Sequence, residues 1–167
     1  MRKLIIAGNW KMYKGLEDAK SFAREVAPIA KGMDTTNVVP ILAPAYPFLA
    51  VLQRDLEGSP VKVSAQDVSS HPDGAFTGEV SAAMLASLKL PYSIVGHSER
   101  RAYHAETNAI VREKLLALTQ HDICPILCVG ETLVQRDAGN TKDVVVDQLS
   151  GALHKINLYN QGEIIIA

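Results

Sequence analysis

The segment Tyr92-Ser93-Ile94-Val95-Gly96-His97-Ser98-Glu99-Arg100-Arg101 runs from a short apolar stretch, through a glycine, into a charged stretch. Gly96 allows the backbone to turn sharply because it has no Cβ. Ser98 and Glu99 are typical of the first turn of a helix. The segment therefore predicts a β-strand over Tyr92–Val95 that leads directly into a short helix.

Outward from this segment, short apolar runs rich in β-branched residues recur along the chain, starting at residues 3, 37, 62, 92, 124 and 163. These runs are nearly continuous rather than alternating, which is typical of parallel strands covered on both faces. The predicted strands are Lys3–Ala7, Asn37–Ala43, Lys62–Ala65, Tyr92–Val95, Cys124–Val129 and Glu163–Ala167.

Helical patterns fill the gaps between these strands. In the first gap Ala19, Ala23 and Ala30 belong to one apolar stripe, and Gly32 follows as a stop signal. The predicted helices are Gly15–Lys31, Pro47–Leu56, Ser81–Leu88, Thr107–Gln120 and Val144–Ile156. Because no linker or low-complexity stretch interrupts the pattern, we expect residues 1–167 to form a single domain.

A βα repeat of roughly 30 residues is the repeat of the (β/α)8 barrel, or TIM barrel, of ~250 residues. The 167 residues supply five βα units and a sixth strand, and the chain then ends on an apolar run. A doubly wound α/β sheet would carry a G-x-G-x-x-G turn after the first strand, whereas this chain has Gly8-Asn9-Trp10-Lys11. We therefore expect an incomplete TIM barrel.

Composition excludes several other classes of protein. The chain is 47% hydrophobic and 21% charged with a formal net charge of -1, which gives no reason to expect a nucleic acid or membrane partner. No apolar run approaches the ~20 residues of a membrane helix, and the apolar start is too short for a secretory signal. On one strand Cys124 and Cys128 would lie about 13 Å apart, too far for a disulfide. We expect a reduced, cytoplasmic protein.

Reactive residues of a βα barrel lie where strands end. Lys11 follows the first strand and is a cation suited to holding a phosphate or a developing oxyanion. His97 follows the fourth strand, where a helix N-terminus favours a neutral imidazole that can donate a hydrogen bond to a carbonyl oxygen. The alternative interpretations are a solvated surface lysine and a structural histidine.

Other strand ends carry less distinctive residues. Gln66-Asp67 after the third strand fits ordinary loop residues, Cys128 fits a small buried hydrophobe, and Glu131 fits an ion-pair partner in the rim. The five histidines are scattered, with no i, i+4 pair and no cluster of known ligand spacing, so we expect no metal site.

Taken together, the motifs resemble the triosephosphate isomerase family along the whole chain. Tyr13 departs from the pattern, since an asparagine is common there in the family. The matching motifs are Ala7–Met12, Ser64–Asp67, Gly74–Glu79, Val95–Arg101 with its continuation to Thr107, and Ile126–Thr132.

The resemblance implies interconversion of dihydroxyacetone phosphate and glyceraldehyde 3-phosphate through an enediol(ate), without cofactor or metal, in glycolysis and gluconeogenesis. It implies that Asn9 and Lys11 bind substrate, that Lys11 stabilises negative charge, and that His97 polarises the carbonyl and moves protons. Supporting positions fall on Glu99, which would hold Lys11 in an ion pair, and on Gln66 and Cys128.

The family is also homodimeric, which gives the loop Gly74–Glu79 a role. The resemblance implies that this loop enters a pocket beside the neighbour's active site, with Phe76, Thr77 and Gly78 in the interface. A long loop with one exposed aromatic residue fits an interface, and it equally fits a flexible surface loop.

The family continues past its sixth strand with the glutamate that acts as catalytic base, and this position would lie just beyond Ala167. The lid and the phosphate-binding glycine turns would also lie there. We therefore expect the 167-residue chain alone to be inactive and to need a complementary C-terminal segment of roughly 80 residues. The alternatives are a non-catalytic fragment that assembles with such a segment, and another phosphosugar enzyme on the same fold.

Overall fold

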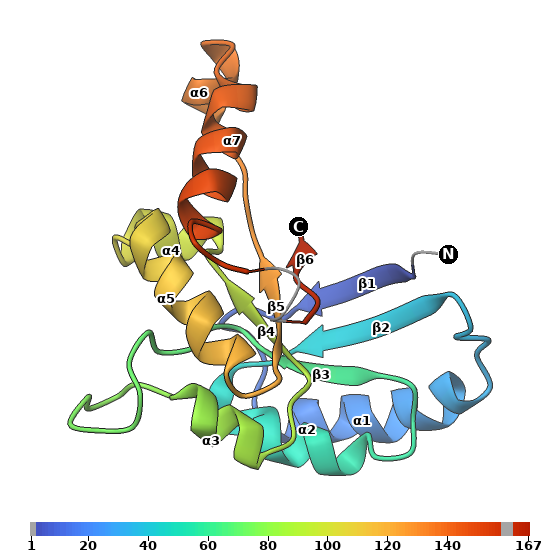
Figure 1. Ribbon diagram of the computed structural model, residues 1–167. Helices are drawn as coiled ribbons and strands as arrows, with labels where there is room; N and C mark the ends of the chain where they lie inside the picture. The colour runs from blue at the N-terminus through green and yellow to red at the C-terminus, as the bar shows by residue number, and fades with distance from the viewer. Residues whose placement is uncertain (1–2, 158–161) are drawn as a thin grey trace.

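A computed structural model describes residues 3–157 and 162–167. Its described part holds one sheet of parallel strands in the order β1-β2-β3-β4-β5-β6. The sheet curls into part of a barrel (Figure 1), which confirms the α/β barrel fold predicted from the repeat. The strands are β1 (Leu4–Asn9), β2 (Val38–Ala43), β3 (Lys62–Ala65), β4 (Tyr92–Val95), β5 (Cys124–Leu127) and β6 (Ile165–Ile166).

Helices follow each of the first five strands; most of them pack against the outside of the sheet, whereas the two that follow the fifth strand extend away from it (Figure 1). The helices are α1 (Leu16–Lys31), the 3-10 turn η1 (Tyr46–Phe48) with α2 (Leu49–Asp55), α3 (Ala82–Ser87), α4 (Ser98–Tyr103), α5 (Asn108–Thr119), α6 (Leu133–Asp137) and α7 (Thr141–Ala152). Among the described residues, no helix is both long enough and apolar enough to cross a membrane.

Both faces of the sheet are apolar. Between strands and helices, a large core includes Leu52, Leu85 and Leu115, each fully buried. On the inner face, a smaller cluster centres on Ile94 and Ile126. Because apolar side chains lie on both faces of the sheet, the apolar runs of the sequence are nearly continuous rather than alternating.

The strand register brings the candidate site residues to one edge of the sheet. Asn9 pairs with Ala43, so β1 and β2 end side by side. Because the strands are parallel, the residues after Ala65, Val95 and Leu127 leave the sheet at the same edge.

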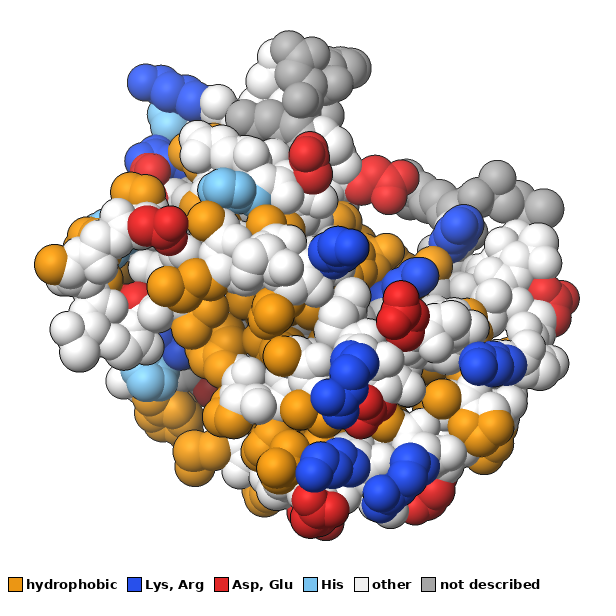
Figure 2. All heavy atoms as spheres, turned by 90° about the horizontal axis from the view of Figure 1, so that it is seen from below, with side chains coloured by type: hydrophobic (Ala, Val, Ile, Leu, Met, Phe, Trp, Pro, Cys, Tyr) orange, Lys and Arg blue, Asp and Glu red, His pale blue; other side chains and the backbone are white. Residues whose placement is uncertain are grey.

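On the face seen from below, charged side chains of both signs lie side by side (Figure 2). Figure 2 views the molecule from below, where hydrophobic side chains gather on one part of the surface and positive and negative side chains are intermixed on another. The intermixing agrees with the formal net charge of -1.

Several predicted boundaries are wrong by a few residues. Asn9 is the last residue of β1 rather than a loop residue, and β5 ends at Leu127 rather than Val129. The strand predicted over Glu163–Ala167 pairs as a strand only at Ile165–Ile166.

The last predicted helix is shifted, and one short helix was not predicted. α7 spans Thr141–Ala152 instead of Val144–Ile156, because the polar first turn carries no apolar stripe to mark it. α6 begins where Thr132 and Gln135 form a capping box, each bonding the other's backbone N–H.

Candidate active site

Lys11 follows the end of β1 with its backbone in the left-handed region, at φ 53°. Asn9 Oδ1 accepts a hydrogen bond of 2.9 Å from the Lys11 N–H. Gln66 Nε2 donates to the Lys11 carbonyl at 2.9 Å and also to the Ala43 carbonyl at 2.9 Å. A left-handed non-glycine residue costs about 1 kcal/mol or more, so these bonds offset the strain and fix the direction in which Lys11 leaves the backbone.

The Lys11 ammonium is held by a residue from α4. Its Nζ lies 2.7 Å from Glu99 Oε1, and about half of each side chain remains exposed. The hydrogen bond with Glu99 raises the pKa of Lys11 above its ordinary value. Lys11 is therefore a fixed cation at neutral pH, with N–H donors left over for a ligand.

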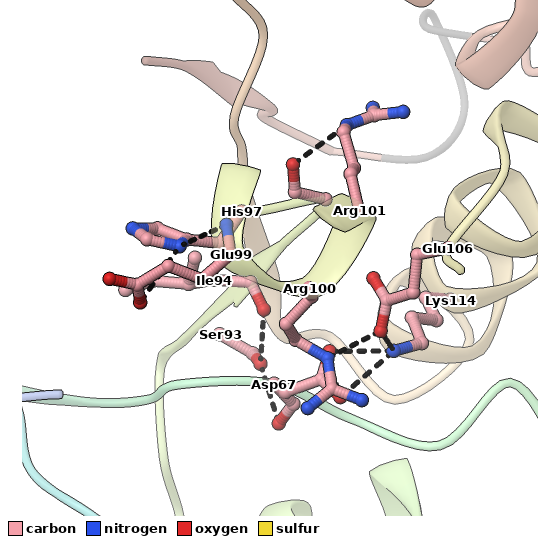
Figure 3. Close-up of polar contacts among 10 residues, drawn as sticks. Asp67, Ser93, Ile94, His97, Glu99, Arg100, Arg101, Glu106 and Lys114 are labelled. Carbon is pink, nitrogen blue, oxygen red and sulfur yellow. Dashed lines mark hydrogen bonds and ion pairs between the residues drawn. The ribbon is translucent and has the colours of Figure 1, made fainter. Parts of the chain in front are cut away.

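His97 is the N-cap residue of α4, and its ring is oriented by the helix that it caps. The backbone N–H of Glu99 donates to His97 Nδ1 at 3.2 Å (Figure 3). Glu99 Oε2 also lies 3.4 Å from Nδ1, a contact that would need a proton on that nitrogen. The backbone N–H is nearer and cannot lose its proton, so Nδ1 acts as acceptor and the neutral ring carries its proton on Nε2.

Gly96 occupies a position that strongly favours glycine. Its φ is +68°, in the left-handed region. A Cβ there would lie 3.1 Å from Arg101 Nη2, 3.2 Å from Val111 Cγ2 and 3.3 Å from the Cys128 carbonyl. Any larger residue at position 96 is therefore disfavoured both by its backbone conformation and by close packing, and the turn before His97 depends on glycine.

A buried ion cluster lies beneath this turn (Figure 3). Lys114 Nζ donates to Asp67 at 2.7 and 2.8 Å and also bonds Glu106. Arg100 Nε lies 2.8 Å from Asp67 and pairs with Glu106 as well. The cluster ties the loop after β3 to α4 and α5, and so supports the segment that carries His97.

The two carboxyl groups of the cluster respond differently to burial. Burial raises the pKa of Asp67, against the attraction of Lys114. Burial acts the same way on Glu106, but the hydrogen bonds from Lys114 and Arg100 outweigh it, and the pKa of Glu106 lies below its ordinary value. Sequence reasoning missed this cluster, and the available signal was Lys114 on the apolar stripe of a predicted helix.

The remaining strand-end residues have structural surroundings. Glu131 accepts from Arg136 at 2.7 Å, as the ion-pair interpretation predicted. Cys128 is partly buried against the inner cluster, and burial raises the pKa of its thiol. Within the described residues, no group of three His, Cys, Asp or Glu side chains is placed to hold a metal ion.

The predicted interface loop stands apart from the strand-end site. Phe76 is 41% exposed and stacks on His71 with ring centroids 4.2 Å apart. Thr77 and Gly78 are exposed, with Gly78 at φ +91°. In the part of the chain that the structure describes, no hydrogen bond or ion pair connects Thr77 to Asn9, Lys11 or His97.

A held cation, and a histidine ring whose Nδ1 accepts a hydrogen bond from its own helix, lie at the carboxyl ends of parallel strands, the edge at which βα-barrel enzymes carry their active sites. Comparison with known proteins gives the particular family. A model of the family described as triosephosphate isomerase matches residues 4–167. The chain belongs to the triosephosphate isomerase family.

Individual relatives support the same family assignment. A triosephosphate isomerase from Delftia acidovorans is 46% identical over 158 residues, which is 93% of this chain and 62% of the relative. One from Ralstonia nicotianae is 43% identical over 166 residues, 99% of this chain and 65% of the relative. One from Thermus thermophilus is 42% identical over 167 residues, the whole of this chain and 66% of the relative. The chain thus spans a little under two thirds of the length of these relatives.

Proposed function

We propose that these residues are the N-terminal part of a triosephosphate isomerase, which interconverts dihydroxyacetone phosphate and D-glyceraldehyde 3-phosphate. The observation that carries this proposal is the bridge made by Glu99. Its carboxylate lies 2.7 Å from Lys11 Nζ, and its N–H bonds His97 Nδ1 at 3.2 Å. One residue thereby sets the two charge-stabilising groups in a fixed relation to each other.

The roles of the two groups follow from their chemistry. Removing a proton next to the substrate carbonyl leaves an enediolate with negative charge on oxygen. His97 presents its Nε2–H to that oxygen, and the Lys11 cation stabilises the developing charge and the phosphate. Asn9 and Gln66 act by holding the Lys11 backbone.

The proton-abstracting base is proposed to come from the part of the protein that the relatives have beyond this similarity. Glu99 is a weak base, because the hydrogen bond from Lys11 lowers its pKa. Glu131 is also a weak base, because the hydrogen bond from Arg136 lowers its pKa. Neither carboxylate suits proton abstraction from carbon at neutral pH.

The part that the relatives have beyond this similarity is also proposed to close the barrel. β1 and β6 are the outer strands of the described sheet, and Leu4 and Ile6 on β1 are 60% and 58% exposed. A complementary C-terminal segment of roughly 80 residues would supply the last two strands and cover these side chains.

Assembly and location are proposed from the same family. We infer a cytoplasmic homodimer in which the loop around Phe76 and Thr77 contacts a second copy. The exposed, stacked Phe76 ring supports an interface at this loop.

The proposal is tested on a completed chain, in which residues 1–167 continue into the C-terminal remainder of the Thermus thermophilus relative. This chain should isomerise glyceraldehyde 3-phosphate in a coupled assay. We expect Lys11→Met and His97→Ala each to lower kcat/KM by about 10²–10³-fold. The controls are Lys20→Met, a half-buried lysine of α1, and His121→Ala, an exposed histidine, and each should change it less than about twofold. A folded completed chain that does not isomerise would refute the proposal.

A further inference from the structure

The two consecutive arginines of α4 point in opposite directions. Arg100 reaches down into the buried ion cluster, whereas Arg101 lies on the other side of the helix (Figure 3). Arg101 Nε donates a hydrogen bond of 2.9 Å to the carbonyl of Gly96. That carbonyl belongs to the peptide that joins Gly96 to His97, so Arg101 holds the plane from which the His97 side chain projects.

The same guanidinium is fixed from its outer side. Arg101 Nη1 donates to Asn108 Oδ1 at 2.7 Å. Asn108 Nδ2 in turn donates to Asp147 Oδ2 at 3.0 Å. This line of hydrogen bonds runs from the Gly96 turn through α4 and the start of α5 to α7.

Close packing keeps Asn108 in place. A Cβ on Gly151 of α7 would come within 2.8 Å of Asn108 Cβ. Such a short separation means that α7 lies directly against Asn108, and only glycine allows this approach. Asn108 therefore presents its oxygen to Arg101 from a position that two helices determine.

The surroundings of the Arg101 guanidinium disfavour its positive charge. Burial lowers the pKa of Arg101, although a guanidinium stays protonated. In the described part of the chain, Arg101 has no direct carboxylate partner within ion-pair distance, and its Nη2 is buried without a hydrogen-bond partner. A half-buried charge that bonds a carbonyl and an amide contributes little to stability, but it is a strong, directional anchor for that carbonyl.

We propose that Arg101 is a positioning residue that sets the orientation of the His97 imidazole through the Gly96 carbonyl, with Asn108 and Asp147 fixing the guanidinium. The inference rests on the proposed function, in which His97 polarises the substrate carbonyl. A displacement of that ring by about 1 Å is enough to lower the rate by about 10²-fold.

The kinetic test compares Arg101 variants of the completed chain. Arg101→Met keeps the length of the side chain and removes all donors, and we expect it to lower kcat by about 10- to 100-fold while KM changes less than about threefold. Arg101→Lys keeps one donor for the Gly96 carbonyl and should recover part of the lost kcat. The matched control is Arg54→Met, which removes an exposed arginine that pairs with its neighbour Asp55.

The second test observes His97 directly by nitrogen and proton NMR of its ring. The parent protein should show one neutral tautomer with the proton on Nε2, and Arg101→Met should broaden or split those signals. Asn108→Ala leaves Arg101 in the turn and should give a smaller change of the same kind, which keeps the test decisive if Arg101→Met does not fold.

An Arg101→Met protein that melts earlier but keeps its kcat and its His97 signals would overturn the inference, because the arginine would then serve stability alone. The NMR result does not depend on turnover. A parent chain that fails to isomerise therefore counts against the proposed function, while the ring signals still decide the role of Arg101.

Discussion

Lys11 is positioned by side chains from three separate parts of the sheet edge. Asn9 ends β1, Gln66 follows β3, and Glu99 lies in α4. Two of the three contacts are made to the backbone of Lys11 rather than to its ammonium group. The orientation of the lysine therefore depends on hydrogen bonds that do not involve its charge.

Gln66→Ala tests that dependence. The substitution removes both donors, so the Lys11 carbonyl loses the Gln66 N–H and the left-handed turn loses one anchor, while the Ala43 carbonyl keeps its bond from the Trp10 N–H. We expect kcat/KM of the completed chain to fall about tenfold and the free energy of unfolding to fall by about 1 kcal/mol.

The matched control is Gln53→Ala. Gln53 Nε2 donates to the carbonyl of Lys89 at 3.1 Å, and Lys89 is also left-handed, at φ 56°. This pair reproduces the Gln66 arrangement away from the strand-end site. It should cost similar stability and leave kcat/KM unchanged, so an equal loss of activity in both variants would contradict the account.

Gly96→Ala tests the turn beside His97. An alanine must adopt φ +68° and place its Cβ 3.1–3.3 Å from three neighbouring atoms. Gly58→Ala is the control for strain alone, since Gly58 has φ +73° and nothing within 4 Å of the added Cβ. Denaturant unfolding should give about 1 kcal/mol for Gly58→Ala and a clearly larger loss for Gly96→Ala, and equal losses would argue against a packed turn.

Sequence reasoning reached Lys11, His97 and the ion pair between Glu99 and Lys11, and it named Gln66 as a supporting position without its contacts. The positions of Lys11 and His97 after strands left other interpretations open, so their roles came from the family resemblance and stay predictions. The bonds from Gln66 and the anchor at Arg101 were not predicted, because an amide or a guanidinium beside a backbone carbonyl leaves no periodic signal in a sequence. These contacts exist only once the strands have been brought side by side.

Among the elements, α4 does the most to assemble the site. His97 caps this helix, and the helix itself directs Glu99 to Lys11, Arg100 to the ion cluster and Arg101 to Asn108 of α5. A helix with contacts on three sides has little freedom to rotate. The short, charged helix that the sequence predicted is therefore the element that couples the ion cluster to the site.

Glu106→Gln tests the cluster. The change leaves Lys114 and Arg100 with Asp67 as their only carboxylate in the cluster, and breaking a buried pair costs about 3 kcal/mol. The pKa of Glu106 is lowered in the folded protein, so its contribution is present above about pH 4.5 and is lost as pH falls through the lower folded value. Urea unfolding should therefore give a large difference from the parent at pH 7 that shrinks below pH 4.5.

Glu113→Gln is the control for Glu106→Gln. Glu113 lies on α5 and pairs with Arg112 at 2.8 Å on the surface. An exposed pair contributes between about 0 and 1 kcal/mol, so this variant should unfold almost like the parent at both pH values. A Glu106→Gln difference that stays constant from pH 7 to pH 3.5 would mean that the cluster is not ionised as described.

Element boundaries were predictable where apolar residues mark them. The helix predicted over Thr107–Gln120 matches α5 almost to the residue, because Thr107 caps it and an apolar stripe runs along it. α6 was missed because it is short and exposed, and the start of α7 was misplaced because its first turn is polar and exposed. Periodicity reports burial, so elements that bury little leave little trace in the sequence.

At the scale of the whole molecule, the βα repeat predicted the parallel sheet and its strand order. The repeat does not by itself reveal domain organisation or assembly, so the single domain and the homodimer stay predictions. The open edges of the described sheet at β1 and β6, and the relatives' greater length, are the observations that connect this chain to a closed barrel.

The proposed mechanism requires Lys11 and His97 to act with a base that residues 1–167 do not supply. The most direct measurement is the isomerisation rate of the 167-residue chain alone and of the completed chain, at equal concentration. We predict a rate at least about 10²-fold lower for the chain alone, and a high rate for the completed chain that His97→Ala removes. Equal rates for the two chains would contradict the account, because the base would then lie within residues 1–167.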